Sequence, residues 1–343
     1  MASCSPEVPS MATVEMDFLH SQLEERKRRL ETAIELTPQH ADLSGLLREV
    51  DSALDRFAAG TYGLCEECHD TVERDRLLAD PLVRFCLDHL SAPERATLQR
   101  DLDLACQLQQ RLLPPVDLKA AGWETSYHYA PVGPVSGDYC DLYPSDGQLF
   151  FVLGDVSGKG VAASMRMTQL HALFRSLIGM GLSLGEIIAH INRFLCDSAL
   201  AGQYATLVCG RANLGGEVEL FNAGHLPAIA VRHGCVQQLG STGMPLGMFR
   251  ETSFTSACLQ MNEGDTLFLY TDGLSEARRE NDEYGIDRVM SLVSRQSSST
   301  TAGLISACLN DLRGFTGASS RLDDLTLLAI RRSGDSSSAV PMS

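Results

Sequence analysis

Long apolar runs, a basic N-terminal segment and an excess of positive charge are all missing from this sequence. Its longest apolar stretches, such as residues 149–153 and 286–293, fall well short of the roughly 20 residues that cross a bilayer. The opening residues, MASCSPEVPSMATVEMD, have neither the basic start nor the apolar core of a signal peptide. These absences predict a cytoplasmic protein that does not enter a membrane.

Positive charge is scarce, because 28 Lys and Arg stand against 44 Asp and Glu and give a formal net charge of −16. Such a surface repels nucleic acids and anionic lipids at long range, so neither is expected as a partner. Paired cysteine spacing is scarce too, which argues against a secreted disulfide framework and favours a reducing compartment. Eight cysteines stand alone and are predicted to be small core residues: Cys4, Cys106, Cys140, Cys196, Cys209, Cys235, Cys258 and Cys308.

Helical periodicity dominates the first third of the chain. Apolar residues recur at helical spacing in residues 14–36 and 43–57, and a break at Thr37, Pro38 and Gln39 separates the two segments. The short connection predicts an antiparallel hairpin, with Gly60 as its C-terminal cap. A third helix is predicted in residues 93–115. Its narrow apolar face is either a packing seam or a self-association surface: Leu98, Leu102, Ala105, Leu108 and Leu112.

From Trp123 onward the pattern changes to short β-prone runs separated by Gly- and Asp-rich turns. Strands are predicted at residues 148–153, 206–211, 218–222, 228–232, 266–270 and 325–331. Two helices, at residues 162–179 and 184–199, interrupt them. The small polar tail after Arg332 is predicted to be disordered.

Four potential zinc ligands lie in two short knuckles. Cys65 and Cys68 form CxxC, and Cys86 and His89 form CxxH after seventeen intervening residues. Three thiolates and one imidazole satisfy the tetrahedral coordination of Zn²⁺ and leave no position open for a substrate, which predicts a structural zinc site.

Residues 43–90 resemble the zinc-finger region of the DksA/TraR family, through the segment GTYGLCEEC followed by RLLADP and FCLDH. His89 stands where that family commonly has a fourth Cys, and His69 replaces a frequent Gly. The resemblance implies the shape of the module. It also opens a rival function, a DksA-like transcription regulator acting at RNA polymerase.

The second half carries four acidic segments in short turns: SGDYCD at residues 136–141, GDVSGKG at 154–160, YTDG at 270–273 and DDLT at 323–326. Each lies at or just beyond an end of a β-prone run, so the carboxylates are predicted to meet at one edge of a sheet. Carboxylate oxygens favour Mg²⁺ or Mn²⁺. Taken singly, each segment is as well explained by a turn.

In their order, these segments resemble the SpoIIE/RsbU-like branch of the metal-dependent protein phosphatases, the PPM family. The resemblance covers residues 100–331 and includes LQQRLLPP, GDVSGKGVAASM, FNAGHLPAIAV, GMPLGM, LYTDGLSEARRENDEYG and DDLTLLAIR. Ser136 and Gly137 replace the usual Gly-Gly of the first segment.

The resemblance implies the following roles: Asp155 bridges two Mn²⁺ or Mg²⁺ ions beside the Val156 carbonyl, Asp272 and Asp323 complete the first metal site, and Asp138 supports the second. Asp155, Asp272 and Asp323 are thus the predicted catalytic residues. Asp141 and Asp324 are alternative or supporting acids, and Asn222 and His225 either hold a loop or assist a proton transfer.

The resemblance also implies an α+β fold, a four-layer α-β-β-α sandwich preceded by a helical hairpin, a zinc finger and a linker helix. It implies hydrolysis of phosphoserine or phosphothreonine by a metal-activated water. The implied substrate is a phosphorylated STAS-domain anti-anti-sigma protein in a partner-switching pathway, and a homodimer through the linker helix is expected. A second rival function, beside the transcription regulator, is a catalytically inactive scaffold.

The expected domain boundaries are a hairpin in residues 1–60, a zinc finger in 61–92, a linker helix in 93–115, a phosphatase domain in 116–332 and a disordered tail in 333–343.

Overall fold

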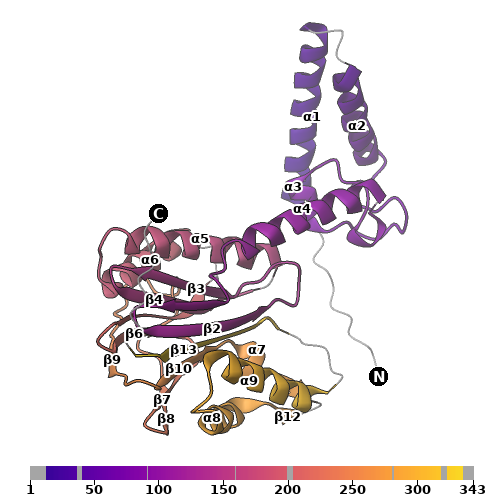
Figure 1. The fold of residues 1–343 in the computed structure, drawn as a ribbon. Coiled ribbons are helices and arrows are strands. Elements are labelled where there is room, and N and C mark those ends of the chain that lie inside the picture. Colours follow the sequence, from indigo (N-terminus) through magenta and orange to yellow (C-terminus); the bar gives the residue numbers. More distant parts are fainter. Residues whose placement is uncertain are drawn as a thin grey trace. The chain divides into compact units, whose positions relative to one another are not determined.

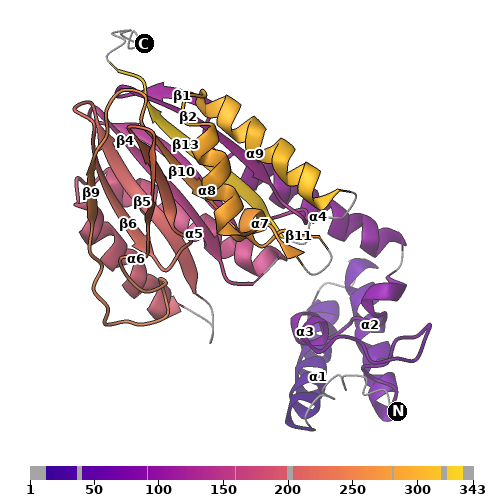
Figure 2. The ribbon, with the colours of Figure 1, turned by 90° about the horizontal axis from the view of Figure 1, so that it is seen from below.

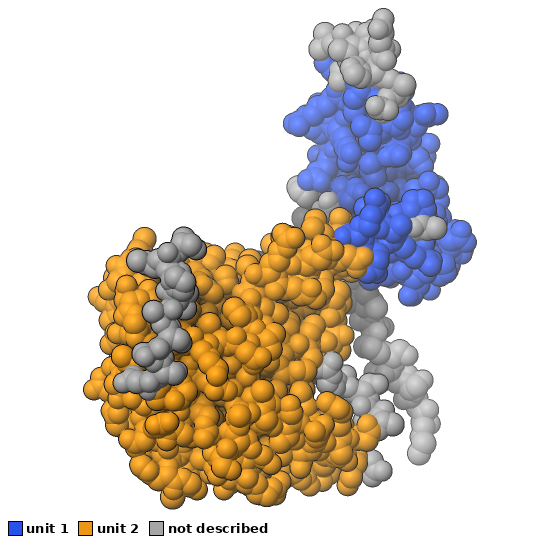
Figure 3. Space-filling model, in the orientation of Figure 1, with its two compact units in different colours: residues 1–100 blue, residues 101–343 orange. Residues whose placement is uncertain are grey.

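The computed structural model describes residues 13–36, 41–90, 92–158, 160–198, 204–279, 282–317 and 323–334. The chain divides into two compact units, residues 1–100 and 101–343, which Figure 3 colours separately. Within the described ranges, no helix is both long and apolar enough to cross a membrane. Most of the predicted tail, residues 335–343, lies outside these ranges, as does the predicted break at Thr37, Pro38 and Gln39.

The first unit contains the predicted hairpin, formed by α1 (Thr13–Leu36) and α2 (Ala41–Ala58). Leu23 of α1 and Val50 of α2 are buried in a small core that Cys65 and Leu77 of the following segment also share. Gly60 has a φ of 68° and its N–H donates to the carbonyl oxygen of Phe57, so the predicted C-terminal cap is confirmed. The short helices α3 (Arg74–Ala79) and η1 (Leu87–His89) complete this unit up to α4 (Ala92–Gln110), the predicted linker helix.

The second unit contains two large antiparallel sheets (Figure 1). The first runs in the order β1 (Asp117–Ala120), β2 (Trp123–Ala130), β13 (Leu325–Arg332), β10 (Thr266–Tyr270), β7 (Ala228–Arg232) and β8 (Cys235–Leu239). The second runs in the order β3 (Tyr139–Ser145), β4 (Gln148–Val156), β5 (Ala205–Asn213), β6 (Glu217–Ala223) and β9 (Ala257–Gln260). The six strands predicted from sequence are all confirmed.

Side-chain alternation along these strands builds three apolar layers. Leu153 of β4, Leu269 of β10 and Trp123 of β2 are buried in the core between the sheets. The outer face of the second sheet packs against α5 (Gly160–Ile178) and α6 (Leu184–Ser198). The outer face of the first sheet packs against α8 (Gly285–Arg295) and α9 (Thr301–Thr316), as Figure 2 shows. The predicted α-β-β-α sandwich is therefore confirmed.

The eight isolated cysteines differ in burial. Cys140, Cys209 and Cys308 are buried as predicted, but Cys235 and Cys258 are exposed, so the prediction of core positions is wrong for these two. Both exposed residues lie on edge strands, where side chains that point away from the core meet solvent. Cys4 lies outside the described residues.

Candidate functional site

Asp138 lies just before β3 and is anchored by threonines of the other sheet. Its Oδ2 atom accepts hydrogen bonds from the hydroxyls of Thr271, at 3.0 Å, and Thr326, at 2.5 Å. Asp138 is only 2% exposed. Burial raises the pKa of Asp138 well above its usual range, and the charge of Asp155 acts in the same direction. The carboxylate of Asp138 thus links the ends of both sheets through hydrogen bonds.

Asp155 reaches the same edge from β4, where alternation turns its side chain toward the space between the sheets. Burial raises the pKa of Asp155 to about 7, and the neighbouring charges of Asp272 and Asp323 contribute to the rise. Asp272 begins the short helix α7 (Asp272–Ser275), directly after β10 and the buried Thr271. Asp323 precedes β13, and its Oδ1 accepts a hydrogen bond from the N–H of Asp324 at 3.0 Å. The structure therefore brings together Asp138, Asp155, Asp272 and Asp323, which sequence places far apart.

Two tight glycine contacts fix this edge. A Cβ atom at Gly273 would lie 1.9 Å from the carbonyl oxygen of Asp324, so only glycine lets α7 approach the start of β13. At Gly137, a Cβ atom would lie 3.0 Å from the Val156 carbonyl oxygen. These close approaches explain why glycine accompanies aspartate in the acidic segments.

The supporting acids are engaged elsewhere. Asp141 faces α5, where Arg175 binds both of its carboxylate oxygens at 2.7 and 2.6 Å. Asp324 accepts hydrogen bonds from the N–H of Val132 and the hydroxyl of Ser136, at 2.7 and 2.6 Å. Asp141 therefore belongs to an ion pair, and Asp324 braces the loop between β2 and β3.

His225 is fully engaged in hydrogen bonds that join the two sheets. Its Nδ1 lies 2.8 Å from Oγ1 of Thr206, and its Nε2 lies 3.1 Å from the carbonyl oxygen of Tyr270. A carbonyl only accepts, so Nε2 carries the proton and Nδ1 accepts from the Thr206 hydroxyl. The His225 N–H also donates to Oδ1 of Asn222, at 2.8 Å. Of the two interpretations made from sequence, these contacts favour the one in which Asn222 and His225 hold the structure together.

No three of the described acidic side chains at this edge bring their oxygens within 4.8 Å of one another. Within the described part of the chain, only Cys65, Cys68, Cys86 and His89 place three or more ligand atoms within 4.8 Å of each other. Like charges that share a buried edge repel, and this repulsion is part of the rise in the pKa of Asp155. A cluster of oxygen donors with this electrostatic imbalance fits hard divalent cations, which would supply the missing positive charge.

The sulfur and nitrogen cluster of the first unit is compact. Sγ of Cys68 lies 3.8 Å from Sγ of Cys86, which lies 3.3 Å from Nδ1 of His89. Zinc–sulfur bonds of about 2.3 Å at tetrahedral angles place two sulfurs about 3.8 Å apart, so the spacing fits Zn²⁺. His69 has a φ of 60°, in the left-handed region that glycine adopts without strain. This conformation explains why glycine is frequent at that position in the resembling family.

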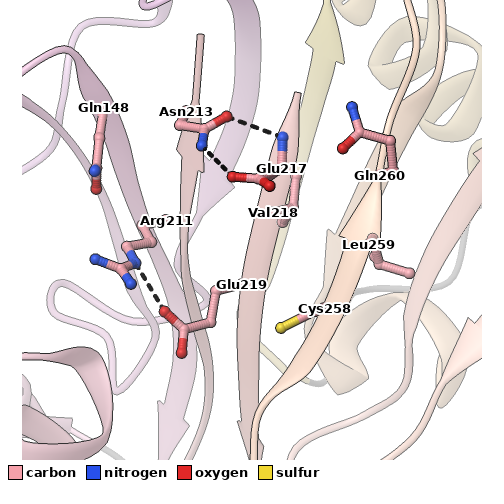
Figure 4. A pocket seen from close by; sticks show the side chains of 9 residues that line it. All are labelled: Gln148, Arg211, Asn213, Glu217, Val218, Glu219, Cys258, Leu259 and Gln260. Atoms are coloured by element: carbon pink, nitrogen blue, oxygen red, sulfur yellow. Dashed lines mark hydrogen bonds and ion pairs between the residues drawn. The ribbon is translucent and has the colours of Figure 1, made fainter. Parts of the chain in front are cut away.

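A separate groove of 630 Å³ lies at the other end of the second sheet (Figure 4). Gln148, at the start of β4, lines it, whereas Asp155 is seven residues further along the strand. This separation corresponds to about 23 Å. Inside the groove Arg211 forms an ion pair with Glu219, and the amide of Asn213 donates a hydrogen bond to Glu217, so its main polar groups are already partnered. The groove does not belong to the acidic edge.

Several residues of the site were not predicted from sequence. Thr271 and Thr326 hold Asp138, although both lie within segments that were recognised for their aspartates. Gln109 of α4 binds the main chain of Ser136 with both ends of its amide, at 2.7 and 3.0 Å. In the sequence, only its place in the segment LQQRLLPP could have indicated that Gln109 contacts the site.

A sandwich of two antiparallel sheets between helices, with carboxylates gathered at one edge, defines the PP2C-type phosphatase fold. The chain belongs to the Stage II sporulation protein E (SpoIIE) family, whose sequence pattern matches residues 145–333. Residues 60–88 match the prokaryotic dksA/traR C4-type zinc finger.

Comparisons with individual proteins agree with this assignment. Phosphoserine phosphatase RsbP of Bacillus subtilis is 29% identical over 185 residues, which make up 52% of this chain and 46% of RsbP. The chain therefore spans less than half the length of that curated relative. The crystal structure of the RsbU and RsbW domains of Rv1364c from Mycobacterium tuberculosis matches with 28% identity and a TM-score of 0.56, covering 64% of this chain and 62% of that one. The SiaA-PP2C domain of Pseudomonas aeruginosa shares the fold, with 17% identity and a TM-score of 0.61 over 71% of this chain and 99% of that one.

Proposed function

We propose that this protein is a metal-dependent protein serine/threonine phosphatase. The observation that carries the proposal is the convergence of Asp138, Asp155, Asp272 and Asp323 from separate segments at one edge of a PP2C-type fold. Membership of the SpoIIE family and the similarity to a phosphoserine phosphatase support it.

Asp155, Asp272 and Asp323 would hold Mn²⁺ or Mg²⁺, with the Val156 carbonyl and Asp138 as further ligands. When bound, the two cations activate a water and neutralise charge that develops on the transferring phosphoryl group. The residues of the chain position these ligands: Thr271 and Thr326 orient Asp138. His225 links Thr206, the cross-strand partner of Asp155, to the end of β10 just before Asp272. A preorganised set of ligands needs little rearrangement when the phosphate arrives.

The substrate we propose is phosphoserine or phosphothreonine on a regulatory protein, specifically a phosphorylated STAS-domain anti-anti-sigma protein. A solved relative joins RsbU and RsbW domains in one chain, which supports a role in partner switching. We further propose a homodimer through α4, because Leu98, Leu104 and Leu108 of this helix are exposed, the last by 57%. The free thiols of the described cysteines fit a reducing compartment, so we place the protein in the cytoplasm.

For the first unit we propose one structural Zn²⁺ on Cys65, Cys68, Cys86 and His89. The donor set and its spacing support this ion, as does the match to a zinc-finger family. Its four protein ligands leave no position for a substrate, so it would stabilise the fold of the finger.

The test is hydrolysis of a phosphoserine-bearing STAS protein by the full chain with Mn²⁺. We expect Asp272→Asn to lower kcat/KM by at least about 100-fold. It removes a metal ligand itself, and removal of an outer-shell partner of such a ligand already costs about 10- to 100-fold. Asp146→Asn is the matched control: this exposed aspartate lies on the turn between β3 and β4 and should keep full activity. Absence of turnover by the wild type at every metal concentration would instead favour an inactive scaffold.

A further inference from the structure

Both carboxylate oxygens of Asp324 accept hydrogen bonds from a single loop of the protein. Its Oδ1 accepts from the N–H of Val132, and its Oδ2 accepts from the hydroxyl of Ser136 and, at 3.3 Å, from the N–H of Gly137. All three donors belong to the connection between β2 and β3. Asp324 therefore ties the start of β13 to the loop that ends at Asp138.

Ser136 extends this tie to Asp138 itself. Its hydroxyl donates to Asp324 at 2.6 Å, and the same oxygen accepts from the N–H of Asp138 at 3.0 Å. Ser136 has no exposed surface, so water does not compete for either bond. One side chain thus links two acidic residues that come from opposite sheets.

The main chain of Ser136 is fixed independently of its side chain. Nε2 of Gln109 donates to the Ser136 carbonyl oxygen at 2.7 Å, and Oε1 of Gln109 accepts from the Ser136 N–H at 3.0 Å. Every polar group of Ser136 then has a partner. A residue held at its backbone by one segment and at its hydroxyl by another leaves the adjacent Asp138 little freedom.

We infer that Ser136 is a positioning residue for Asp138, through a hydroxyl that the usual Gly-Gly pattern of this segment lacks. The inference rests on the proposed function, in which Asp138 supports the second cation. With the hydroxyl present, the Asp138 main chain is locked to Asp324 while Thr271 and Thr326 orient its carboxylate. Ser136 touches neither cation nor substrate and acts only through Asp138.

The test is calorimetric titration of Mn²⁺ into the full chain freed of hard cations, with its zinc content measured beforehand. We expect Ser136→Ala to weaken one Mn²⁺-binding event by about tenfold, the lower end of the loss seen when outer-shell partners of a metal ligand are removed. The Mn²⁺ concentration for half-maximal activity should rise by the same factor, while kcat at saturating Mn²⁺ stays within about twofold of wild type. Exchange of the Asp138 amide hydrogen should become faster, because its acceptor is gone.

The matched control is Ser275→Ala in α7. Ser275 is also buried, but its hydroxyl has no hydrogen-bond partner among the described residues, so Mn²⁺ binding should not change. Should Ser136→Ala not fold, Ser136→Gly restores the usual pattern and carries the same expectation. Wild-type Mn²⁺ affinity in a folded Ser136 variant would overturn the inference and leave the proposed function standing. Failure of the wild type to bind Mn²⁺ or to hydrolyse phosphoserine would instead contradict the proposed function.

Discussion

Nε2 of His225 lies 3.1 Å from the carbonyl oxygen of Tyr270, and this contact joins the two sheets at the acidic edge. The other ring nitrogen accepts from Thr206, which pairs with Asp155 across β4 and β5. Tyr270 lies two residues before Asp272. One imidazole therefore connects β5, the neighbour of the strand that carries Asp155, to the end of β10, just before Asp272.

This contact predicts a pH-dependent loss of stability. Burial lowers the pKa of His225 to about 4, so the ring stays neutral in the folded protein and gains a proton when the chain unfolds below its ordinary pKa of 6.5. The unfolded state then binds more protons, and stability falls as pH drops from 6.5 toward 4. The shift corresponds to about 3 kcal/mol. We expect urea denaturation followed by fluorescence of the single tryptophan, Trp123, to show this loss.

The control is His225→Gln, which keeps hydrogen-bonding groups and does not titrate. Its unfolding free energy should be lower than that of wild type at pH 7, but the difference should shrink by about 3 kcal/mol on going to pH 4. Taking this difference cancels the opposite contribution of carboxylates with raised pKa values, such as Asp155. A difference that is constant with pH would contradict the assignment of a buried neutral imidazole.

Asp155 predicts proton release on metal binding. Burial and the neighbouring aspartates raise its pKa to about 7 in the absence of a cation, so a large share of the molecules carries a proton there just below neutral pH. A divalent cation favours the carboxylate, so binding releases that proton and the apparent affinity falls as pH drops below 7, by about tenfold per pH unit for one proton. Calorimetry with Mn²⁺ at pH 6 in two buffers of different ionisation enthalpy measures the released protons. At pH 8.5 Asp155 is already ionised, so the number should be lower by nearly one, and equal values at both pH would disprove the linkage.

Apolar periodicity predicted β4, β5, β6, β7, β10 and β13 because their runs are bounded by Gly and Asp and are largely buried on both faces. The edge strands β1, β3, β8 and β9 were not predicted, and neither was β2, which lies inside the first sheet and pairs with β13 from the far end of the unit. Helix α9 also went unrecognised: Leu304, Cys308 and Leu312 form its buried seam, but Gly303 and Gly314 lower its intrinsic helix propensity. Tertiary packing against the first sheet compensates for that deficit.

The acidic residues of the site were found from short segments in which Asp follows or precedes a strand. Their partners were not, because the bonds of Asp138 to Thr271 and Thr326 span most of the second unit. For the same reason, the sequence alone left Asp324 as an alternative to Asp323 in the role of metal ligand. Only the folded chain shows that the loop between β2 and β3 donates three hydrogen bonds to Asp324.

The close approach at Gly273 allows a steric test of the sheet edge that carries the acidic residues. Gly273→Ala would place a methyl group 1.9 Å from the carbonyl oxygen of Asp324, so α7 must move away from β13. Such overpacking costs about 1–3 kcal/mol or more and would displace Asp272. We expect a lower urea midpoint together with weaker Mn²⁺ binding. Gly314→Ala in α9 is the control, because its Cβ meets no atom within 4 Å and should leave stability unchanged or raise it by up to about 1 kcal/mol.

Removal of one thiol tests the zinc finger. Cys65 is both a proposed zinc ligand and part of the small core that contains Tyr62 and Leu77. Cys65→Ser should therefore lose the single zinc, measured by atomic absorption, and should expose residues 60–90 to limited proteolysis, because folding of such modules depends on the ion. Cys258→Ser changes an exposed thiol and should retain both the zinc and the proteolytic pattern. Since serine preserves the volume of cysteine closely, a fold that survived without zinc would mean that apolar packing alone sustains the finger.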